Sequence, residues 1–410
     1  MNILFVCGLY GRSTNGILEA ILTQEFRKRG HEVYVVGMTS IDQPEEVNLD
    51  GIHTFGLASP WFHEFNEKHG GSKKLISKII FQTVRIIRNL CVTLTFPNVN
   101  PIRSRRLWRF CRSFVVNYNI DLALCTFQPY EAISTSIKLK KQFGDRLKVV
   151  NYHLDLTTVP ANTMGAIVSW KIRLAHRALR RELNVVDRLL LPESAEDLHL
   201  QNEKITYVGF PVYIVDYPTV KLPDVFDNNE VNVVYCGSLD STNRDPMYAL
   251  HLIEKIGRVG GRKIRIHIWG SISSQQLKEN IVSVDCVSYH GFIDSFYVPA
   301  LLRRADFLLN VSNKVTYNMI PSKTFQQLAA HRPIINFVKH PDDYSVRYFN
   351  QCGYALRINE YENDNDLDVV KLGNYLKEYM DKTVEYNDLL YIKSTPQYIA
   401  NVIEKVYAKD

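Results

Sequence analysis

Several kinds of sequence signal are missing from this chain of 410 residues. Its seven cysteines include no CxxC pair and no spacing typical of metal ligands, so we expect buried free thiols in a reducing compartment and no zinc site. The sequence also contains no low-complexity tract and no internal repeat of about 20 to 50 residues. These absences exclude a disulfide-stapled scaffold and a solenoid.

The chain also lacks the signals that direct proteins into or across membranes. Residues 1–16, MNILFVCGLYGRSTNG, contain no basic region, long apolar run or cleavage site of the kind found in signal peptides. No segment approaches the roughly 18 to 20 uninterrupted apolar residues that span a bilayer. We therefore expect a cytoplasmic protein.

Acidic residues are absent from one long stretch. Residues 71–120, here called the basic segment, contain ten Lys and Arg and no Asp or Glu. Outside the basic segment, 39 Lys and Arg face 43 Asp and Glu, although the whole chain carries a net charge of +6. One local stretch therefore makes this protein basic.

The basic segment has the spacing of an amphipathic helix. In SKKLISKIIFQTVRIIRNL, residues 72–90, apolar side chains follow one helical stripe (Ile76, Ile80, Val84, Ile87) and polar ones follow another (Lys74, Lys78, Gln82, Arg85, Asn89). A second cluster in IRSRRLWRFCR, residues 102–112, consists of Trp108 with Arg103, Arg105, Arg106, Arg109 and Arg112. Such a segment packs on its own domain or contacts an anionic membrane surface. We expect no nucleic-acid partner, because no recognisable nucleic-acid module accompanies the charge.

Apolar runs and helical patterns alternate through the first half of the chain. Residues 2–8 and 31–37 are apolar runs that flank a helical pattern at residues 15–30, which predicts a βαβ unit. Further strands are predicted in DLALCTF, LKVVNYHLD and DRLLLPE, with a long helix around WKIRLAHRALRREL. These elements predict a parallel sheet that extends to about residue 207.

A second series of strands and helices begins after a proline-containing stretch, GFPVYIVDYPTVKLPDVFDNNE. With 46% hydrophobic residues, the chain is long enough for two ordinary cores. We predict an α/β protein of two Rossmann-like doubly wound domains that face a central cleft. The expected parts are an acceptor domain at 1–207, a linker at 208–230, a donor domain at 231–390, and a C-terminal helix at 391–410 that returns to the first domain.

Residues 318–337, NMIPSKTFQQLAAHRPIINF, place Lys323 in the first turn of a short apolar helix. A cation is unfavourable there, because the helix N-terminus already presents exposed N–H groups that attract anions. Lys323 makes more physical sense if an anion lies between it and the helix. The alternative is an ordinary solvated lysine.

This segment resembles a known motif. Pro321, Ser322 and Lys323, followed by Gln326 and the run Arg332 to Ile335, are similar to P-S-K-x-x-E-x-x-A-x-G-x-P-V-I. That motif marks the donor site of nucleotide-sugar glycosyltransferases with two Rossmann-type domains, the GT-B fold. The similarity is greatest to retaining family 4 and related enzymes of bacterial polysaccharide synthesis, and it extends through VYCGSLDSTNRDP and HGFIDSFYVPALLRRADFLLNVS.

The resemblance implies a site for a nucleoside-diphosphate sugar. Lys323 would contact the diphosphate, Arg244 would be a second clamp, and Gly237 would let the backbone approach the phosphates. For Arg244 an ordinary surface arginine remains the alternative, because the turn is offset by one residue from the family spacing. The implied donor-binding residues are Gly237, Ser238, Arg244, Gly270, His290, Gly291, Phe292, Met319, Ile320, Ser322, Lys323 and Gln326.

The sequence departs from the family pattern at two functional positions. A pair of glutamates eight residues apart is replaced by Asn318 and Gln326. The Gln326 amide still offers hydrogen bonds to ribose hydroxyls, whereas Asn318, expected beside the reacting sugar, provides no negative charge for an oxocarbenium ion. His331 replaces the usual glycine after the helix, where we expect left-handed backbone geometry.

Acceptor-side candidates lie in the first half of the chain. In NYHLDL, His153 and Asp155 come at the predicted carboxyl end of a strand, two residues apart and hence on one side of it, as a base or as sugar-binding groups. A buried structural pair is the alternative. The turn GLYGRSTNG suits a phosphate or close approach of an acceptor, through Gly11, Arg12, Asn15 and Gly16, although it is not a G-x-G-x-x-G dinucleotide motif.

The D-x-D at Asp364 and Asp366 matches the metal signature of the other glycosyltransferase fold. It lies in a polar stretch far from the donor motif, so we interpret it as a solvated acidic turn. We expect no metal requirement and no cofactor beyond the nucleotide-sugar donor.

The resemblance therefore implies a metal-independent, retaining, hexosyltransferase-like enzyme of cell-surface polysaccharide synthesis. Its partners would be a nucleotide-sugar donor, a glycan or lipid-linked acceptor, and an anionic membrane surface bound through the basic segment at the inner face of the membrane. Two alternatives stay open. One is a catalytically weak nucleotide-sugar-binding scaffold or regulatory subunit, and the other is a nucleotide-sugar epimerase on the same fold.

Overall fold

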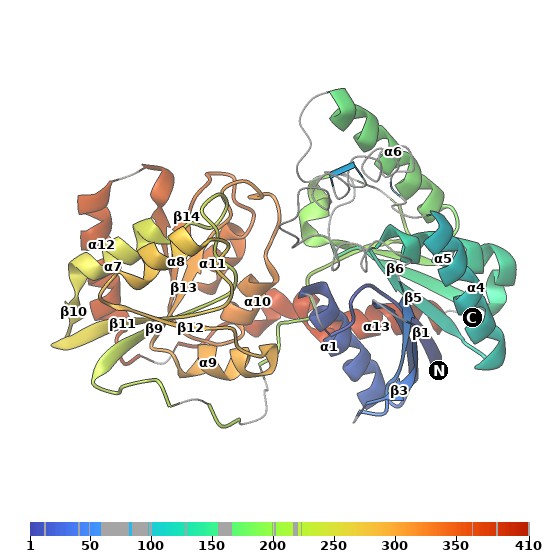
Figure 1. Cartoon of the computed structure of the whole chain (residues 1–410), viewed down its shortest axis with the longest axis horizontal. Coiled ribbons are helices and arrows are strands. Elements are labelled where there is room, and N and C mark those ends of the chain that lie inside the picture. Colours follow the sequence, from blue (N-terminus) through green and yellow to red (C-terminus); the bar gives the residue numbers. More distant parts are fainter. Residues whose placement is uncertain are drawn as a thin grey trace. The chain divides into compact units, whose positions relative to one another are not determined.

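The computed structural model describes residues 1–11, 14–39, 42–48, 50–58, 82–83, 97, 101–127, 129–154, 166–198, 200, 202–215, 220–222, 224–362, 364–382 and 384–408 (Figure 1). The chain divides into two compact units. Unit 1 contains residues 1–211 and 396–410, and unit 2 contains residues 212–395. The C-terminal residues thus belong to the same unit as the N-terminus.

Unit 1 is built on an eight-stranded sheet in the order β3-β4-β2-β1-β5-β6-β7-β8. All neighbouring strands are parallel except β3, which runs antiparallel to β4. The strands are β1 (Asn2–Val6), β2 (Glu32–Thr39), β3 (Gln43–Val47), β4 (His53–Ala58), β5 (Leu122–Thr126), β6 (Lys148–Tyr152), β7 (Arg188–Pro192) and β8 (Ile205–Val208). The helices are α1 (Thr14–Lys28), α4 (Pro101–Asn117), α5 (Tyr130–Phe143), α6 (Ala166–Leu183) and α13 (Pro396–Tyr407).

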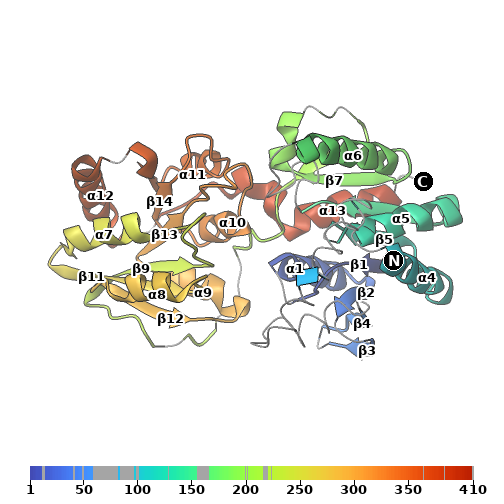
Figure 2. The ribbon, with the colours of Figure 1, turned by 45° about the horizontal axis from the view of Figure 1, so that its top comes forward.

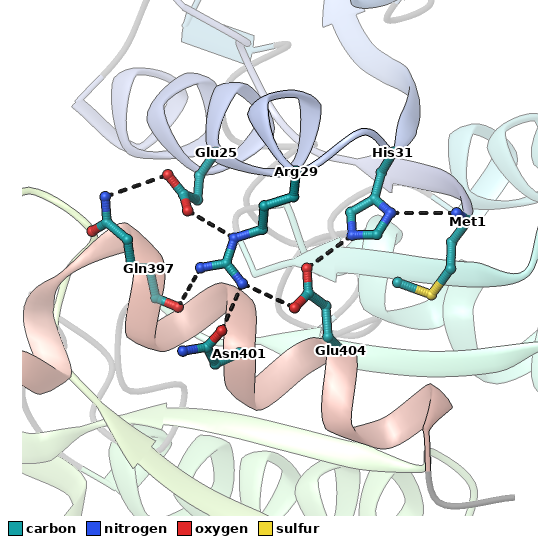
Figure 3. A network of polar contacts seen from close by, with 7 residues as sticks. All are labelled: Met1, Glu25, Arg29, His31, Gln397, Asn401 and Glu404. Atoms are coloured by element: carbon teal, nitrogen blue, oxygen red, sulfur yellow. Dashed lines mark hydrogen bonds and ion pairs between the residues drawn. The ribbon is translucent and has the colours of Figure 1, made fainter.

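Helices cover both faces of this sheet (Figures 1 and 2). Leu4 and Val6 of β1 share a buried core with residues of α4, α5 and α6 on one face. On the opposite face α1 packs beside α13, which crosses from the end of the chain. Arg29, one residue beyond α1, donates hydrogen bonds to Asn401 at 2.6 Å and to Glu404 at 2.9 Å on α13 (Figure 3).

Unit 2 is built on a seven-stranded sheet with the order β10-β11-β9-β13-β14-β15, in which β12 also pairs with β11. The strands are β9 (Glu230–Cys236), β10 (Arg258–Val259), β11 (Arg262–Trp269), β12 (Val287–Gly291), β13 (Phe307–Val311), β14 (Ile334–Val338) and β15 (Ala355–Asn359). The helices are α7 (Met247–Ile256), α8 (Gln275–Val282), α9 (Val298–Arg304), α10 (Ser322–Leu328), α11 (Val346–Cys352) and α12 (Asn365–Tyr379). All pairs are parallel except β10 with β11.

The two faces of the unit 2 sheet have different character. Apolar side chains of the strands pack against α7, α8 and α12 in one continuous core. The opposite face carries buried polar residues, among them Asn232, His267, Asn310 and Asn336. These groups hydrogen-bond within the sheet layer, as in the 2.8 Å bond from the Asn310 amide to Asn336. The polar row continues toward the carboxyl ends of the strands, where ligands of such sheets bind.

Each sheet has one point at which the direction of strand addition reverses. In unit 1 the chain moves from β1 outward to β2 and later returns to β5, so the reversal lies between β1 and β5. In unit 2 it lies between β9 and β13. Side chains at the carboxyl ends of these strand pairs are therefore the first candidates for a site.

Several local structures differ from the sequence-based expectations. Strands β3, β4, β8, β10 and β15 were not predicted. The acidic stretch at Asp364 and Asp366 is solvated, as predicted, since both residues are exposed, but it begins a helix instead of forming a turn. Asp364 caps α12 by accepting a hydrogen bond from the Leu367 N–H, and Asp368 is buried with its carboxylate bonded to Tyr248. His331 has a φ of +52°, which confirms the expected left-handed geometry. Five of the six cysteines in the described part of the chain are buried and all six are free, as predicted.

Among the described residues, no helix is both long enough and apolar enough to cross a bilayer. The predicted amphipathic helix at residues 72–90 lies outside the described residues, apart from residues 82–83. The second basic cluster forms α4. Arg103 of this cluster is buried and faces Glu131, so it does not belong to an exposed patch.

Candidate functional site

Lys323 lies at the strand-order reversal of unit 2. It is the second residue of α10, as predicted, but its side chain is buried rather than exposed at the end of the helix. The ammonium Nζ donates a 3.0 Å hydrogen bond to the Val311 carbonyl at the end of β13. It also lies 3.4 Å from the Tyr235 hydroxyl and 4.8 Å from the centre of the Tyr235 ring, on the adjacent strand β9. The cation is therefore held against the ends of β9 and β13.

Lys323 is electrostatically undersatisfied in this position. Burial lowers its pKa well below the usual value, and the nearby positive charge of Arg244 lowers it further. Asp343 opposes this shift to a smaller extent. A dianionic group beside Lys323 and Arg244 would stabilise both charged side chains.

Arg244 is positioned by a turn that is joined to the loop after β13. Within the turn, Asp240 and Arg244 form a pair of backbone hydrogen bonds, and the Arg244 guanidinium donates to Asn313 and lies 3.4 Å from the Ser238 hydroxyl. Asn243 accepts hydrogen bonds through its side chain from the backbone N–H groups of Val315 and Thr316. These contacts place Arg244 close enough to Lys323 for its charge to act on the lysine.

Three glycines follow one another across the carboxyl edge of the sheet. Gly237 comes after β9, Gly270 after β11, and Gly291 ends β12. Gly270 has a φ of +132°, and a Cβ there would lie 2.0 Å from the Gly237 carbonyl oxygen. Gly237 has a φ of +145°, and a Cβ there would lie 3.8 Å from Cδ of Lys323. Only glycine allows these two strand ends to approach so closely, and the result is an edge of bare backbone next to Lys323.

Aromatic rings form a stack beside these glycines. His290 lies 4.4 Å from Trp269 and 5.3 Å from His267, with nearly parallel rings. Nδ1 of His267 lies 3.0 Å from Nε2 of His290, so the two rings share one hydrogen bond. Burial lowers the pKa of His267 to about 4, and the adjacent His290 adds to this effect. Burial also lowers the pKa of His290, so both rings favour the neutral form.

The loop after β12 carries an exposed aromatic side chain next to a hollow. Phe292 is 87% exposed and borders a hollow of about 410 Å³. Lys221, Asp294 and Tyr297 also line this hollow. An exposed ring beside polar groups is suited to stacking on a flat heterocycle.

The remaining donor candidates lie in and before α10. Four of them are partly buried (Asn318, Met319, Ser322 and Gln326), and Ile320 is buried. The Met319 N–H bonds to the Thr316 carbonyl, which tightens the turn that leads into α10. Gln326 borders a narrow hollow with Pro299 and Arg303 of α9. The neighbouring Gln327, which we did not predict, donates to the Leu309 carbonyl and joins α10 to β13.

In unit 1, His153 follows β6 and is buried. Its ring is stacked on Phe127 at 5.2 Å, and Nε2 lies 2.8 Å from a Glu182 carboxylate oxygen. The same oxygen accepts a hydrogen bond from the Asn151 amide. Asp155, the predicted partner, lies outside the described residues, and the partner that the structure shows is Glu182 from α6. Nδ1 of His153 is itself buried and has no hydrogen-bond partner in the described part of the chain.

The turn after β1 lies at the strand-order reversal of unit 1. The Gly11 N–H donates to the Gly16 carbonyl at 3.0 Å, which closes the turn in front of α1. A Cβ at Gly16 would lie 1.9 Å from the Leu9 carbonyl oxygen, so no other residue fits there without a shift of the backbone. Asn15 is partly buried near this turn, and Arg12 lies outside the described residues.

One titratable residue at this edge was not predicted. Glu19 of α1 is buried between the ends of β1 and β5 and accepts a hydrogen bond from Thr126. Burial raises its pKa to about 7, and the hydrogen bonds from Thr126 and Cys7 lower it only in part. The signal was present in the sequence, because Glu19 shares its helical stripe with Leu22 and Phe26. An acidic residue on an apolar stripe indicates a carboxyl group that is buried for a specific structural or functional reason.

Comparisons with known proteins identify the architecture. No protein-family model matches the chain, and no curated protein matches it by sequence. Among solved structures, TarM, a GT-B protein, superimposes with a TM-score of 0.55 at 9% identity over 99% of both chains. The chain has the GT-B fold.

A UDP-N-acetylglucosamine 2-epimerase superimposes with a TM-score of 0.55 at 10% identity, over 100% of this chain and 97% of the other. A protein of Listeria monocytogenes assigned to the same epimerase class gives a TM-score of 0.54 at 9% identity and the same coverage.

The GT-B architecture fits the two sheets described above, each with its own strand-order reversal. In each unit the candidate residues collect at the carboxyl edge of the sheet: Lys323, Arg244 and the three glycines in unit 2, and Gly11, Gly16 and Glu19 in unit 1. At such low identities the likeness is one of fold. The chemistry therefore has to be argued from the side chains of this chain.

Proposed function

We propose that this protein is a glycosyltransferase that moves a sugar from a nucleoside-diphosphate donor to a glycan or a lipid-linked acceptor. The observation that carries the proposal is the buried Lys323, paired with Arg244 at a glycine edge on the strand-order reversal of unit 2. Two cations with little compensating negative charge favour a diphosphate as the ligand. The GT-B fold, shared with TarM, is consistent with this assignment.

The proposed chemistry depends on the charge of the leaving group. As the bond between the sugar and the phosphate breaks, negative charge develops on the diphosphate, and Lys323 and Arg244 stabilise it. The backbone at Gly237 and Gly270 leaves room for the phosphates beside Ser238. The base would stack on Phe292, next to His290 and Gly291. This arrangement needs no metal ion to neutralise the leaving group, so we propose a metal-independent reaction.

On the sugar side, the chain provides amides where the related motif has carboxylates. Asn318 and Gln326 would hydrogen-bond the transferred sugar and the ribose, and the turn at Met319 and Ile320 would fix the loop beside them. His153, held by Glu182, would present Nδ1 to a hydroxyl group, with Asp155 next to it. Gly11, Arg12, Asn15 and Gly16 would contact the acceptor. We propose retention of anomeric configuration, which NMR of the product would test.

We further propose that the enzyme acts in cell-surface polysaccharide synthesis, in the cytoplasm at the inner face of the membrane. The support is the outer surface of α4, where Arg105, Arg109 and Arg112 are exposed together with Ile102 and Val116. Exposed arginines interspersed with exposed apolar side chains suit the interface of an anionic bilayer.

A nucleotide-sugar epimerase is the second candidate, because two structures of that class superimpose over the whole chain. The same cations would then hold a diphosphate that leaves and returns. The two functions separate in an assay without acceptor, where an epimerase converts the donor sugar to its epimer and a transferase does not. A scaffold that binds a nucleotide sugar without turnover would give neither product.

The test is calorimetric titration of UDP, GDP and dTDP, followed by turnover with sugars of the diphosphate that binds. The variant is Lys323→Met, which keeps the aliphatic length and removes a buried charge, so we expect it to fold. Its matched control is Lys263→Met, an exposed lysine at the opposite end of β11. We expect Lys323→Met to lose about 2 to 4 kcal/mol of transition-state stabilisation, measured as kcat/KM, and the control to be unchanged.

The same calorimetric titration also measures whether binding takes up a proton. Burial and Arg244 lower the pKa of Lys323, and a bound diphosphate raises it again, so binding takes up a proton at any pH between the pKa of the free protein and that of the complex. The heat of binding should therefore depend on the ionisation enthalpy of the buffer, and this dependence should disappear in Lys323→Met. Binding without buffer dependence, together with unchanged kcat/KM in Lys323→Met, would show that Lys323 does not contact the diphosphate.

A further inference from the structure

Unit 1 contains a second positively charged hollow, on residues separate from the turn after β1 and from His153. It has a volume of about 580 Å³ and lies between α5 and α6. This volume is within the range of ordinary small-molecule sites. Four cationic side chains line it, Lys138 and Lys141 from α5 and Arg177 and Arg181 from α6, and no acidic side chain is among the lining residues that the structure describes.

Among the described residues, the four cations have no counter-ion. In the described part of the chain, no carboxylate forms an ion pair with any of them, whereas Lys140, next to Lys141 in sequence, contacts Asp145 and Asp187 and bonds to the Leu147 carbonyl. Positive charge in the last turn of a helix is favourable by itself, and Lys141 of α5 and Arg181 of α6 lie there. Lys138 and Arg177 lie outside those last turns, so their charges need a different explanation.

Their spacing increases the mutual repulsion. Arg177 and Arg181 are four residues apart on α6, and Lys138 and Lys141 are three apart on α5, so each pair places like charges on one helix face. Arg105 of α4 adds a fifth charge nearby, and together with burial it lowers the pKa of Lys138. Clustered cations of this kind are stabilised when an anion binds among them.

The shape of the hollow indicates the rest of the ligand. The hollow also has aromatic and aliphatic surface beside the cations, which comes from Tyr130, Ile137, Leu174 and Ala178. The volume exceeds what one phosphate group needs, so there is room for an organic group next to it. Arginine pairs bind phosphate oxygens in a bidentate manner, which favours phosphate over a simple carboxylate.

We propose that the hollow between α5 and α6 binds the phosphate or diphosphate group of a phosphorylated organic molecule, with Arg177 and Arg181 as the principal phosphate ligands. The group comes either from a soluble phosphate ester or from the headgroup of an anionic lipid. This inference does not depend on the proposed donor site, because it uses other residues in the other unit.

The test measures binding of inorganic pyrophosphate to the full-length protein by calorimetry. The variant is Arg177→Gln combined with Arg181→Gln, and the control is Arg180→Gln. Arg180 is adjacent to Arg181, is equally exposed and does not line the hollow. We expect the double variant to weaken pyrophosphate binding at one site by about tenfold or more, and Arg180→Gln to leave it unchanged.

A second arm separates the two sources of phosphate. Co-sedimentation with phosphatidylcholine vesicles that contain phosphatidic acid should decrease in the double variant, relative to Arg180→Gln, only if the ligand is a lipid headgroup. Equal sedimentation together with reduced pyrophosphate binding identifies a soluble phosphate ester.

The proposal is overturned if the double variant binds pyrophosphate and vesicles no more weakly than Arg180→Gln does, since Arg177 and Arg181 would then have no specific role. The variant Lys323→Met distinguishes this site from the proposed donor site. If Lys323→Met has no effect on pyrophosphate binding while the double variant does, the donor assignment fails and the hollow in unit 1 stands.

Discussion

At the scale of single residues, Glu19 shows how a buried carboxyl couples the fold to pH. Its side chain is 2% exposed, with one carboxyl oxygen bonded by Thr126 and the other without a hydrogen-bond partner among the described residues. Burial raises its pKa from 4.5 to about 7. The folded protein therefore binds this proton more tightly than the unfolded chain does.

The sign of the pH effect follows from this difference. Below about pH 4.5 the carboxyl is protonated in both states, and as the pH rises toward 7 the unfolded chain releases its proton first. The free energy of unfolding should consequently fall across this window, by on the order of 3 kcal/mol from this group. We predict that Glu19→Gln is more stable than the native protein at pH 8 and equally stable at pH 4.5.

Urea denaturation at the two pH values would measure the effect of Glu19→Gln. The control is Glu46→Gln, an exposed position in the same unit. An identical pH dependence in Glu19→Gln and the native protein would show that the Glu19 carboxyl is ionised in the folded state without cost.

At the scale of elements, one arginine makes several of the polar contacts between α13 and the end of α1 (Figure 3). Arg29 is bonded to Glu25 at 2.7 Å on its own side and to Glu404, Asn401 and the Gln397 carbonyl on α13. A second contact joins the Glu404 carboxylate to His31 at 2.8 Å. These bonds fasten the last helix of the chain to the first, across more than 360 positions in sequence.

We predict that Arg29→Ala destabilises unit 1 by about 2 to 3 kcal/mol. The loss is large because Glu25, which is 8% exposed, keeps a buried charge without its cation. Hydrogen exchange of residues 396–407 would measure the effect, with Lys28→Ala as the control at an adjacent exposed position.

Faster exchange confined to α13 would show that Arg29 fastens this helix locally. Unchanged exchange would mean that the apolar contacts of Ile399 and Ile403, both fully buried, hold α13 without the polar network.

At the scale of the whole molecule, the net charge of +6 is concentrated in the basic segment. On α4, Arg105, Arg109 and Arg112 are exposed, whereas Arg103 is buried and Arg106 pairs with Asp42. Of the arginines predicted to form a cluster on α4, these three are therefore exposed and able to contact a membrane surface.

We predict that the triple variant Arg105→Gln, Arg109→Gln and Arg112→Gln binds anionic vesicles less tightly, by about 1 kcal/mol per removed charge. The control removes the same number of charges elsewhere, as Arg258→Gln, Lys263→Gln and Lys278→Gln in unit 2. Co-sedimentation at low and high salt measures both. Equal losses in the two triple variants would attribute vesicle binding to net charge alone, and the α4 surface would then have no special role.

Much of the architecture was predictable because it follows from local patterns. Apolar runs that alternate with helical spacing predict strands and helices, and doubly wound sheets follow from their order. Strands β3 and β4 were missed because QPEEV and HTFGLA lack a continuous apolar run. The resemblance implied three donor-site glycines, and the structure places all of them at the carboxyl edge of the unit 2 sheet (Gly237, Gly270 and Gly291).

The sequence by itself determined most of the strands and helices, where glycines allow strand ends to approach, and that a lysine lies in the first turn of α10. Only the tertiary structure decided that Lys323 turns inward onto β9 and β13, that His153 is held by Glu182, and that Arg103 faces Glu131. It also decided that cations of α5 and α6 meet around one hollow. The physical reason is that periodicity specifies which face of an element is buried. The partner on that face depends on strand order, which brings together residues that are far apart in the chain.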